Sequence, residues 1–170
     1  MIIIMRYIDK KVSSISYDCM NQLQHLFPKF YYKAQPKIDE YIIQLSKYPT
    51  DLGDYIENNN ITSTSELNNM LGFNIDEKIS DMIDELHDYG IIHGDLHENN
   101  IVINPTNKDV KFIDLDSNYS YRITELKENP ELFAKVVKFF NATQMDGTEI
   151  TTIEELLNYE KRMWKTCFII

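Results

Sequence analysis

Three polar residues in the middle of the chain have the types and the spacing that phosphoryl transfer requires. Asp95 and Asn100 lie in a stretch that reads HGDLHENN, and Asp114 directly follows a later apolar run. Phosphoryl transfer needs divalent cations to meet the charge on the moving group, and Mg²⁺ prefers carboxylate and amide oxygens. It also needs a carboxylate that orients the attacking hydroxyl and accepts its proton. These three side chains are therefore candidates for a phosphotransfer site.

The residues after the first stretch predict how Asn100 and Asp114 come together. Residues 101–103 and 110–113 are short apolar runs, and the turn-rich residues 104–109 between them predict a β-hairpin. Asn100 stands at the start of the hairpin and Asp114 at its end. Because the two strands pair, we expect the amide and the carboxylate to lie close enough to bind one or two Mg²⁺ ions.

A helix is predicted directly before the site. Asn74 and Glu77 have the spacing of a capping box, and apolar residues at positions 79, 82, 83 and 86 repeat with the period of a helix. Gly90 ends that pattern. Other helices are predicted around residues 20–27, 38–45, 51–60, 64–71, 130–140 and 152–163, and residues 2–8 are predicted to form a buried strand.

The composition predicts one folded domain and argues against a nucleic-acid-binding protein. The chain has 170 residues, of which 43% are hydrophobic, and a formal net charge of −10. A nucleic-acid-binding protein normally carries a basic stripe that neutralises phosphates, and the sequence shows none. Lys29, Lys33 and Lys37 do surround three aromatic residues. That stretch is either a solvated face or a contact surface for an acidic partner.

The cysteines and the apolar segments indicate a soluble cytoplasmic protein. Cys19 and Cys167 are far apart, and neither has the neighbours of a metal site, so two free thiols in a reducing compartment are expected. The apolar residues 1–5 are too few for a signal peptide or a membrane span. We therefore expect no membrane partner.

The residues around the site resemble the protein-kinase-like superfamily. Residues 86–101 are similar to the end of the long helix and the catalytic loop of that superfamily, which has the form H-x-D-L-x-x-x-N, and residues 112–116 resemble its metal-binding D-F-G stretch. Gly94 replaces an arginine of regulated protein kinases, as in aminoglycoside, choline and RIO-type kinases. The resemblance implies an α+β fold, mostly α-helical, with a short catalytic β-hairpin and an N-terminal hinge strand.

Carried over position by position, the resemblance assigns catalytic roles to three residues of the loop. It implies that Asp95 is the catalytic base and that His93 is a structural residue that supports the loop. His97 stands where serine/threonine kinases carry a phosphate-contacting lysine, so it is a candidate contact to the γ-phosphate. A solvated loop residue is an equally good interpretation of His97.

The resemblance also implies that the cofactors are ATP and Mg²⁺. Asn100 would be one ligand of the Mg²⁺, and Asp114 would be the main ligand that bridges the metal to the phosphates. Asp116 stands in place of the glycine of the D-F-G stretch and is a further candidate metal ligand. A solvated loop residue explains Asp116 equally well.

The start of the chain resembles the last strand of the small lobe as it enters the hinge. Met5, Arg6, Tyr7 and Ile8 would then contact the adenine, mostly through their backbone. No G-x-G-x-x-G motif and no V-A-I-K-like strand with its lysine occur in the sequence. Residues 1–170 are thus expected to form a single C-terminal lobe without the small ATP-binding lobe.

Three hypotheses about function remain open at this point. The first is a minimal ATP- and Mg²⁺-dependent phosphotransferase that acts on a hydroxyl of a protein or a small molecule. The second is an inactive pseudokinase that binds a partner, and the third is one half of a split kinase. In the last two, a partner chain or a second copy of this chain would cover the face where the small lobe normally packs.

Overall fold

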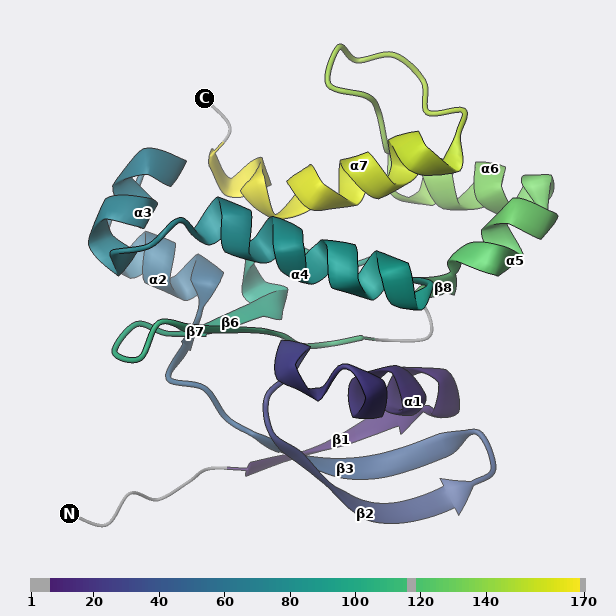
Figure 1. Cartoon of the computed structure of the whole chain (residues 1–170), viewed down its shortest axis with the longest axis horizontal. Helices are drawn as coiled ribbons and strands as arrows, with labels where there is room; N and C mark the ends of the chain where they lie inside the picture. The colour runs from purple at the N-terminus through teal and green to yellow at the C-terminus, as the bar shows by residue number, and fades with distance from the viewer. Residues whose placement is uncertain (1–6, 116–118, 169–170) are drawn as a thin grey trace.

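A small antiparallel sheet and a larger helical body make up the two layers of the structure (Figure 1). The computed structural model describes residues 7–115 and 119–168. The sheet has the strand order β1-β3-β2 and consists of β1 (Tyr7–Ser13), β2 (Phe30–Lys37) and β3 (Glu40–Ser46). After β3 the chain enters the helical body through residues 47–49 and the short strand β4 (Thr50–Asp51).

A helix inserted between β1 and β2 joins the sheet to the helical body. This helix, α1 (Ser14–Gln22), begins at the N-cap Ser13 and is followed by the 3₁₀ turn η1 (Gln24–Leu26). In Figure 1, α1 lies on the side of the sheet that faces the body. Its buried residues Cys19 and Met20 belong to one apolar cluster that also contains residues of the sheet and of the body. The two layers therefore share a core.

The helical body is built around α4 (Ile75–Tyr89), which lies along its centre (Figure 1). One face of this helix buries Ile75, Ile79, Met82, Ile83 and Leu86. The helix begins at the N-cap Asn74 and ends at Gly90, whose φ of 105° only glycine adopts easily. The other helices of the body are α2 (Leu52–Asn58), α3 (Thr64–Leu71), α5 (Ile123–Glu128), α6 (Pro130–Phe139) and α7 (Ile153–Met163), and the 3₁₀ turn η3 (Trp164–Phe168) follows α7.

Short strands connect the end of α4 to the rest of the body. The first, β5 (Ile91–Ile92), pairs with β8 (Tyr121–Arg122). The loop after β5 passes through the 3₁₀ turn η2 (Glu98–Asn100) into a hairpin of β6 (Ile101–Asn104) and β7 (Asp109–Phe112). The hairpin register places Ile101 opposite Phe112.

Most of the predicted elements are confirmed. The fold is α+β and mostly helical, with the expected catalytic hairpin, and α3, α4, α6 and α7 form where the sequence predicted them. Thr152 and Glu155 form the full capping box of α7. The helix expected over residues 38–45 is wrong, because most of this segment is β3. Its apolar residues also fit a strand, and pairing with β1 on one side and β2 on the other outweighs the helical spacing.

The connection between the two layers lies elsewhere than the sequence predicted. Tyr7 and Ile8, expected at the hinge, begin β1 at the edge of the described sheet, and the chain reaches the body only at residues 47–49. Met5 and Arg6 lie outside the described residues. A layer of one helix and three strands thus precedes the connection. The charged run from Asp9, read as the end of a strand, is in fact inside β1.

The buried face of α4 gives a test of this packing. We expect Ile83→Ala to lower the free energy of unfolding by about 2–5 kcal/mol, because Ile83 is fully buried and the cavity cannot be refilled. Asp81→Ala, on the exposed face of the same helix, is the matched control and should change it by less than about 0.5 kcal/mol. Urea unfolding followed by circular dichroism measures both, and equal effects would contradict the packing described.

Candidate active site

The order of elements predicted around Asp95 is present, and Asp95 lies in the loop between β5 and β6. The backbone of this loop bonds to itself twice, since His97 N–H donates to the carbonyl oxygen of Asp95 at 3.1 Å and Asn100 N–H donates to that of His97 at 2.9 Å. These bonds close the loop into a tight turn. The side chain of Asn100 is buried beneath it, with 5% of its surface exposed.

Asn100 holds the carboxylate of Asp95 in place. Its Nδ2 donates to the backbone oxygen of Asp95 at 2.7 Å and to Oδ2 of the same residue at 3.1 Å. The other carboxylate oxygen of Asp95 lies 3.7 Å from Nε2 of His97. The Asp95 side chain is 39% exposed. Asp95 therefore presents a fixed and accessible carboxylate, as a general base must.

The expected proximity of the two ends of the hairpin is present in the backbone. Ile113 N–H donates to the carbonyl oxygen of Asn100 at 3.0 Å, and Asp114 is the next residue. Asp114 has a φ of 57°, a left-handed conformation that is rare outside glycine. Such a backbone is strained and persists only where the surrounding structure imposes it, which is common at functional sites. This backbone conformation turns Asp114 out of the line of β7.

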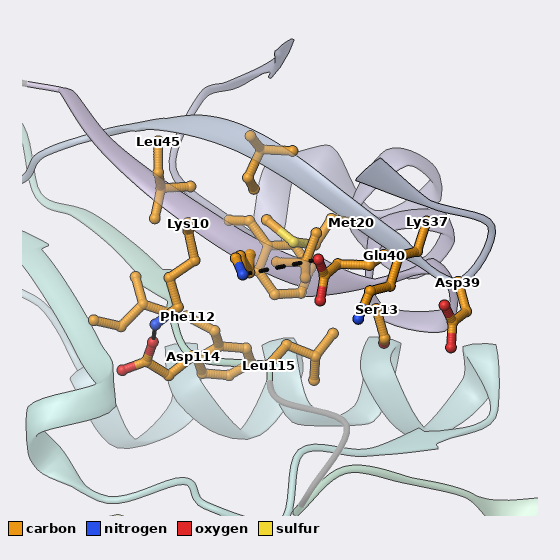
Figure 2. A pocket seen from close by; sticks show the side chains of 15 residues that line it. Lys10, Ser13, Met20, Lys37, Asp39, Glu40, Leu45, Phe112, Asp114 and Leu115 are labelled. Atoms are coloured by element: carbon orange, nitrogen blue, oxygen red, sulfur yellow. Dashed lines mark ion pairs between the residues drawn. The ribbon is translucent and has the colours of Figure 1, made fainter. Parts of the chain in front are cut away.

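Lys10 of β1 forms an ion pair with Asp114 across the two layers (Figure 2). Both side chains are about one third exposed, at 39% and 35%. Figure 2 shows them pointing toward one another from the sheet and from the end of the hairpin. The sequence analysis found no lysine of this kind. A signal was present, since Ile8, Lys10 and Val12 alternate along one strand and share a face.

A cavity of about 360 Å³ opens beside this ion pair, between the sheet and β7. Apolar side chains that include Met20, Phe27 and Leu45 line part of it. Charged side chains line the rest: Lys10, Lys11, Lys37, Asp39, Glu40 and Asp114. Figure 2 shows Lys10 and Asp114 at one side of the cavity and Lys37 and Asp39 at the other. Apolar surface combined with convergent polar groups is typical of small-molecule sites. The cavity has the volume of such sites, which begin at about 300 Å³.

His93 links the catalytic loop to the residue before Asp114. The ring is fully buried, its Nε2–H donates to the carbonyl oxygen of Ile113 at 2.8 Å, and its Nδ1 accepts from the N–H of Asp95 at 3.3 Å. Both bonds need the neutral ring with its proton on Nε2. Burial lowers the pKa of His93, which keeps the ring neutral. The structure thus places His93 as a support between two candidate catalytic carboxylates.

Glu160 of α7 anchors the same loop, and the sequence analysis missed it. Its carboxylate is 1% exposed and accepts from the N–H of His93 at 3.0 Å and from that of Gly94 at 2.7 Å. His87 of α4 contacts it through Nε2 at 2.9 Å. Burial raises the pKa of Glu160, but the bonds from His87 and Gly94 outweigh burial and hold the pKa below its ordinary value. The anion is therefore the stable form.

Gly94 is required because a backbone segment passes directly over it. It has a φ of 82°, and a Cβ at this position would lie 1.8 Å from the carbonyl oxygen of Tyr119. No side chain fits there unless that segment moves. This explains in steric terms why a glycine precedes Asp95.

His97 and Asp116 are the two site residues for which the sequence allowed a second interpretation as solvated loop residues. His97 caps η2, since its Nδ1 accepts from the N–H of Asn99 at 3.2 Å, and its ring is 42% exposed beside Asp95. Asp116 lies outside the described residues. Within residues 7–115 and 119–168, no three His, Cys, Asp or Glu side chains are grouped to hold a metal.

The remaining expectations concern the thiols and the membrane. Cys19 is a buried free thiol, and burial raises its pKa to about 12, so it is unreactive. Among the helices of the described part of the chain, none is long and apolar enough to cross a bilayer.

Comparison with known proteins identifies one family and one related structure. Residues 6–163 match the family described as "Lipopolysaccharide core biosynthesis protein (WaaY)". The structure is similar to that of the kinase PK-1 of Cydia pomonella granulovirus, with a TM-score of 0.52 and 17% sequence identity over 71% of this chain. The chain spans 45% of the length of that kinase. No curated protein matches the sequence. The protein-kinase-like fold expected from the catalytic loop is therefore confirmed.

The steric role of Gly94 can be tested against a second glycine. Gly147 has the same φ of 82° but nothing within 4 Å of its Cβ position. We expect Gly147→Ala to cost about 1 kcal/mol from backbone strain alone. Gly94→Ala adds the clash with Tyr119 and should cost several times more, measured as the loss of unfolding free energy. Similar losses in the two variants would refute the close approach.

The buried carboxylate gives a pH-dependent prediction. Because the pKa of Glu160 is lowered on folding, its stabilising effect is full above its ordinary pKa of 4.5 and is lost as the pH falls through the folded value. We expect Glu160→Gln to cost about 2–3 kcal/mol at pH 7, since the amide cannot accept both N–H bonds. The difference from the wild type should shrink below pH 4.

Chemical denaturation at several pH values measures this difference. Glu154→Gln, on the exposed face of α7, is the control and should behave as the wild type. A constant difference between pH 7 and pH 3 would show that the charge of Glu160 is not what stabilises the loop.

Proposed function

The chain belongs to the WaaY family of lipopolysaccharide core biosynthesis proteins, and we propose that it is an ATP-dependent phosphotransferase that acts on a hydroxyl group. The observation that carries this proposal is a set of contacts that joins four residues: Asn100 bonds to Asp95, the backbone of Asn100 bonds to the residue before Asp114, and Lys10 forms an ion pair with Asp114. A purely structural remnant of the fold has no need for two acidic side chains, an amide and a lysine at one site. Phosphoryl transfer uses all four.

In this proposal, the sheet layer acts as the small nucleotide-binding lobe. Lys10 reaches from β1 to Asp114, as a lysine that clamps phosphates must reach from the small lobe to the metal-binding carboxylate. The apolar part of the cavity lining, with Leu45 on β3 and Phe112 on β7, would receive the adenine. The proposed nucleotide site thus includes Lys10 in place of the predicted contacts from residues 5–8.

The donors at the site fit Mg²⁺. This ion is usually bound through one or two carboxylates together with the phosphates of the substrate, so a group of three acidic side chains is not needed. Asp114 would hold it with Asn100, and the bound ion would neutralise charge on the phosphates. The ion pair with Lys10 supports this role, because it shows that the Asp114 carboxylate is accessible to a positive group.

The protein residues then perform the acid–base part of the reaction. Asp95 would orient the acceptor hydroxyl and take its proton as the hydroxyl oxygen attacks the γ-phosphorus and the bond to the β-phosphate breaks. Asn100 keeps Asp95 in that position through the bond to Oδ2. His97, half exposed beside Asp95, would contact the γ-phosphate, as the resemblance implies.

The acceptor is proposed from the family description. The matched family is named for the biosynthesis of the lipopolysaccharide core, which is a saccharide. We therefore propose a sugar hydroxyl as the acceptor, in preference to a protein side chain. Both belong to the acceptor classes that a carboxylate such as Asp95 can activate.

A partner chain is a second possibility that one observation favours. In the described sheet β1 is an edge strand, and Ile8 on it is 47% exposed. An unpaired strand edge can pair with another chain. A second copy or a different protein would then complete the nucleotide-binding layer. Light scattering after size exclusion measures the oligomeric state. A monomer that binds Mg-ATP without any added partner would refute this possibility.

Calorimetry with ATP and Mg²⁺ tests the proposed function directly. We expect the wild type to bind Mg-ATP and to lose binding when EDTA removes the metal. Asp114→Ala should abolish binding, and Lys10→Ala should weaken it about tenfold or more, because a charge-assisted bond to phosphate is lost. Lys127→Ala, an exposed lysine of α5, is the control and should bind as the wild type.

Two results would overturn the proposal. Absence of any binding at millimolar ATP would exclude an autonomous nucleotide site. Binding that is unchanged in Lys10→Ala and Asp114→Ala would place the nucleotide elsewhere on the molecule.

A further inference from the structure

Two exposed aromatic rings lie stacked beside the catalytic loop. Tyr119 precedes β8 and Phe139 ends α6, and their ring centroids are 5.8 Å apart with an angle of 29° between the planes. Tyr119 is 36% exposed and Phe139 is 63% exposed. Exposure of a single large apolar side chain is ordinary, but adjacent exposed rings make a surface that favours a ligand.

The backbone that carries the first ring lies against Gly94, the residue that precedes Asp95. Ser120, next to Tyr119, donates from Oγ to the carbonyl oxygen of His93 at 2.7 Å. The carbonyl oxygen of Tyr119 itself occupies the space where a side chain of Gly94 would lie. The pairing of β8 with β5 continues this contact along the chain. Tyr119 thus has a fixed position relative to the catalytic loop.

The ring of Phe139 is supported by two successive aromatic contacts. Phe139 packs edge-to-face on Phe140 with centroids 5.6 Å apart, and Phe140 does the same on Tyr121 at 6.5 Å. The backbone of Phe140 is fixed by the hydroxyl of Tyr159, which donates to its carbonyl oxygen at 3.2 Å. Phe140 also reaches to 3.2 Å from the Cβ position of Gly94. Both exposed rings therefore rest on one ordered base that touches the loop.

We propose that Tyr119 and Phe139 form the binding platform for the acceptor, and that the ligand they bind is a saccharide ring. This inference rests on the proposed function, because it assigns the acceptor subsite of the same reaction. A pyranose has a face of C–H groups that packs on an aromatic ring, while its hydroxyls point outward to water or to polar groups. A half-exposed pair of rings offers an apolar face to the C–H groups and leaves the hydroxyls in water.

The position of the platform favours a sugar over the other flat ligand of the reaction. In the proposed function the adenine lies in the cavity between the sheet and β7, which Tyr119 and Phe139 do not line. The base under these rings reaches Gly94, the residue before Asp95, so a saccharide stacked on them would lie on the side of the loop that carries the proposed base. An apolar peptide side chain is the competing occupant, and the experiment separates the two.

Binding of deacylated lipopolysaccharide core oligosaccharide tests the platform without any need for turnover. Saturation-transfer NMR and calorimetry measure its affinity for the wild type, Tyr119→Ala and Phe139→Ala. We expect each truncation to weaken binding about tenfold, since one stacked ring contributes roughly that factor. Tyr119→Phe and Phe139→Tyr keep the rings and should keep the affinity. Tyr32→Ala, a 57% exposed ring of β2, is the matched control.

Kinetics provide a second readout. With ATP in excess, the alanine variants should raise KM for the oligosaccharide about tenfold and change kcat much less, because the ring binds the acceptor and takes no part in the chemistry. Thermal unfolding confirms that each variant is folded. Phe139 is the more exposed ring, so Phe139→Ala keeps the test valid if Tyr119→Ala disturbs the loop.

The outcomes separate this inference from the proposed function. Unchanged oligosaccharide affinity in both alanine variants would overturn the platform. Mg-ATP binding that depends on Asp114, together with no oligosaccharide binding but ring-dependent binding of a hydroxyl-bearing peptide, would overturn the saccharide and leave phosphotransfer standing. Oligosaccharide binding that depends on the rings supports the platform, even where Mg-ATP binding fails and the phosphotransfer proposal falls.

Discussion

The carboxylate of Glu160 lies where water does not reach it, so the protein must supply every hydrogen bond that it needs. Two successive N–H groups of the catalytic loop and the ring of His87 do so. This requirement joins α7, the end of α4 and the loop into one unit. Breaking it would leave a buried charge unpaired, at a cost of several kcal/mol. The position of Asp95, two residues beyond His93, follows from that constraint.

The second layer of the structure is coupled to this unit through charge. Lys10 brings a positive group from β1 to Asp114, which is itself held in a left-handed conformation at the end of the hairpin. His93 connects the two parts, since it bonds to the backbone of both Asp95 and Ile113. Three contacts in series therefore join the sheet, the end of the hairpin and the loop.

The sequence predicts the parts of this site that depend on short spacing. Asp95, Asn100 and Asp114 could be found because a loop and a tight hairpin bring them together within a few residues of the chain. Glu160 could not, since it meets the loop across a long stretch of sequence and no local pattern marks it. The platform of Tyr119 and Phe139 was missed for the same reason. The alternation of Ile8, Lys10 and Val12 marks the face of a strand on which Lys10 lies, but it does not indicate that Lys10 meets Asp114.

The strand β3 was not predicted for a different reason. Residues 38–45 place apolar side chains at spacings that fit a helix and a strand alike, and only the neighbouring strands decide between them. By contrast, α4 was predicted well because its cap, its apolar face and its terminal Gly90 all agree. Agreement between several local signals is what made a segment predictable here.

The absence of a side chain at Gly94 has a consequence for control of the protein. The Tyr119 carbonyl fills the space from which an arginine would otherwise extend to read a phosphate on a neighbouring segment. The loop consequently has no side chain at this position that could bind such a phosphate. A covalent mark on a neighbouring segment would have to be read by another residue, because the space beside residue 94 is already occupied by backbone.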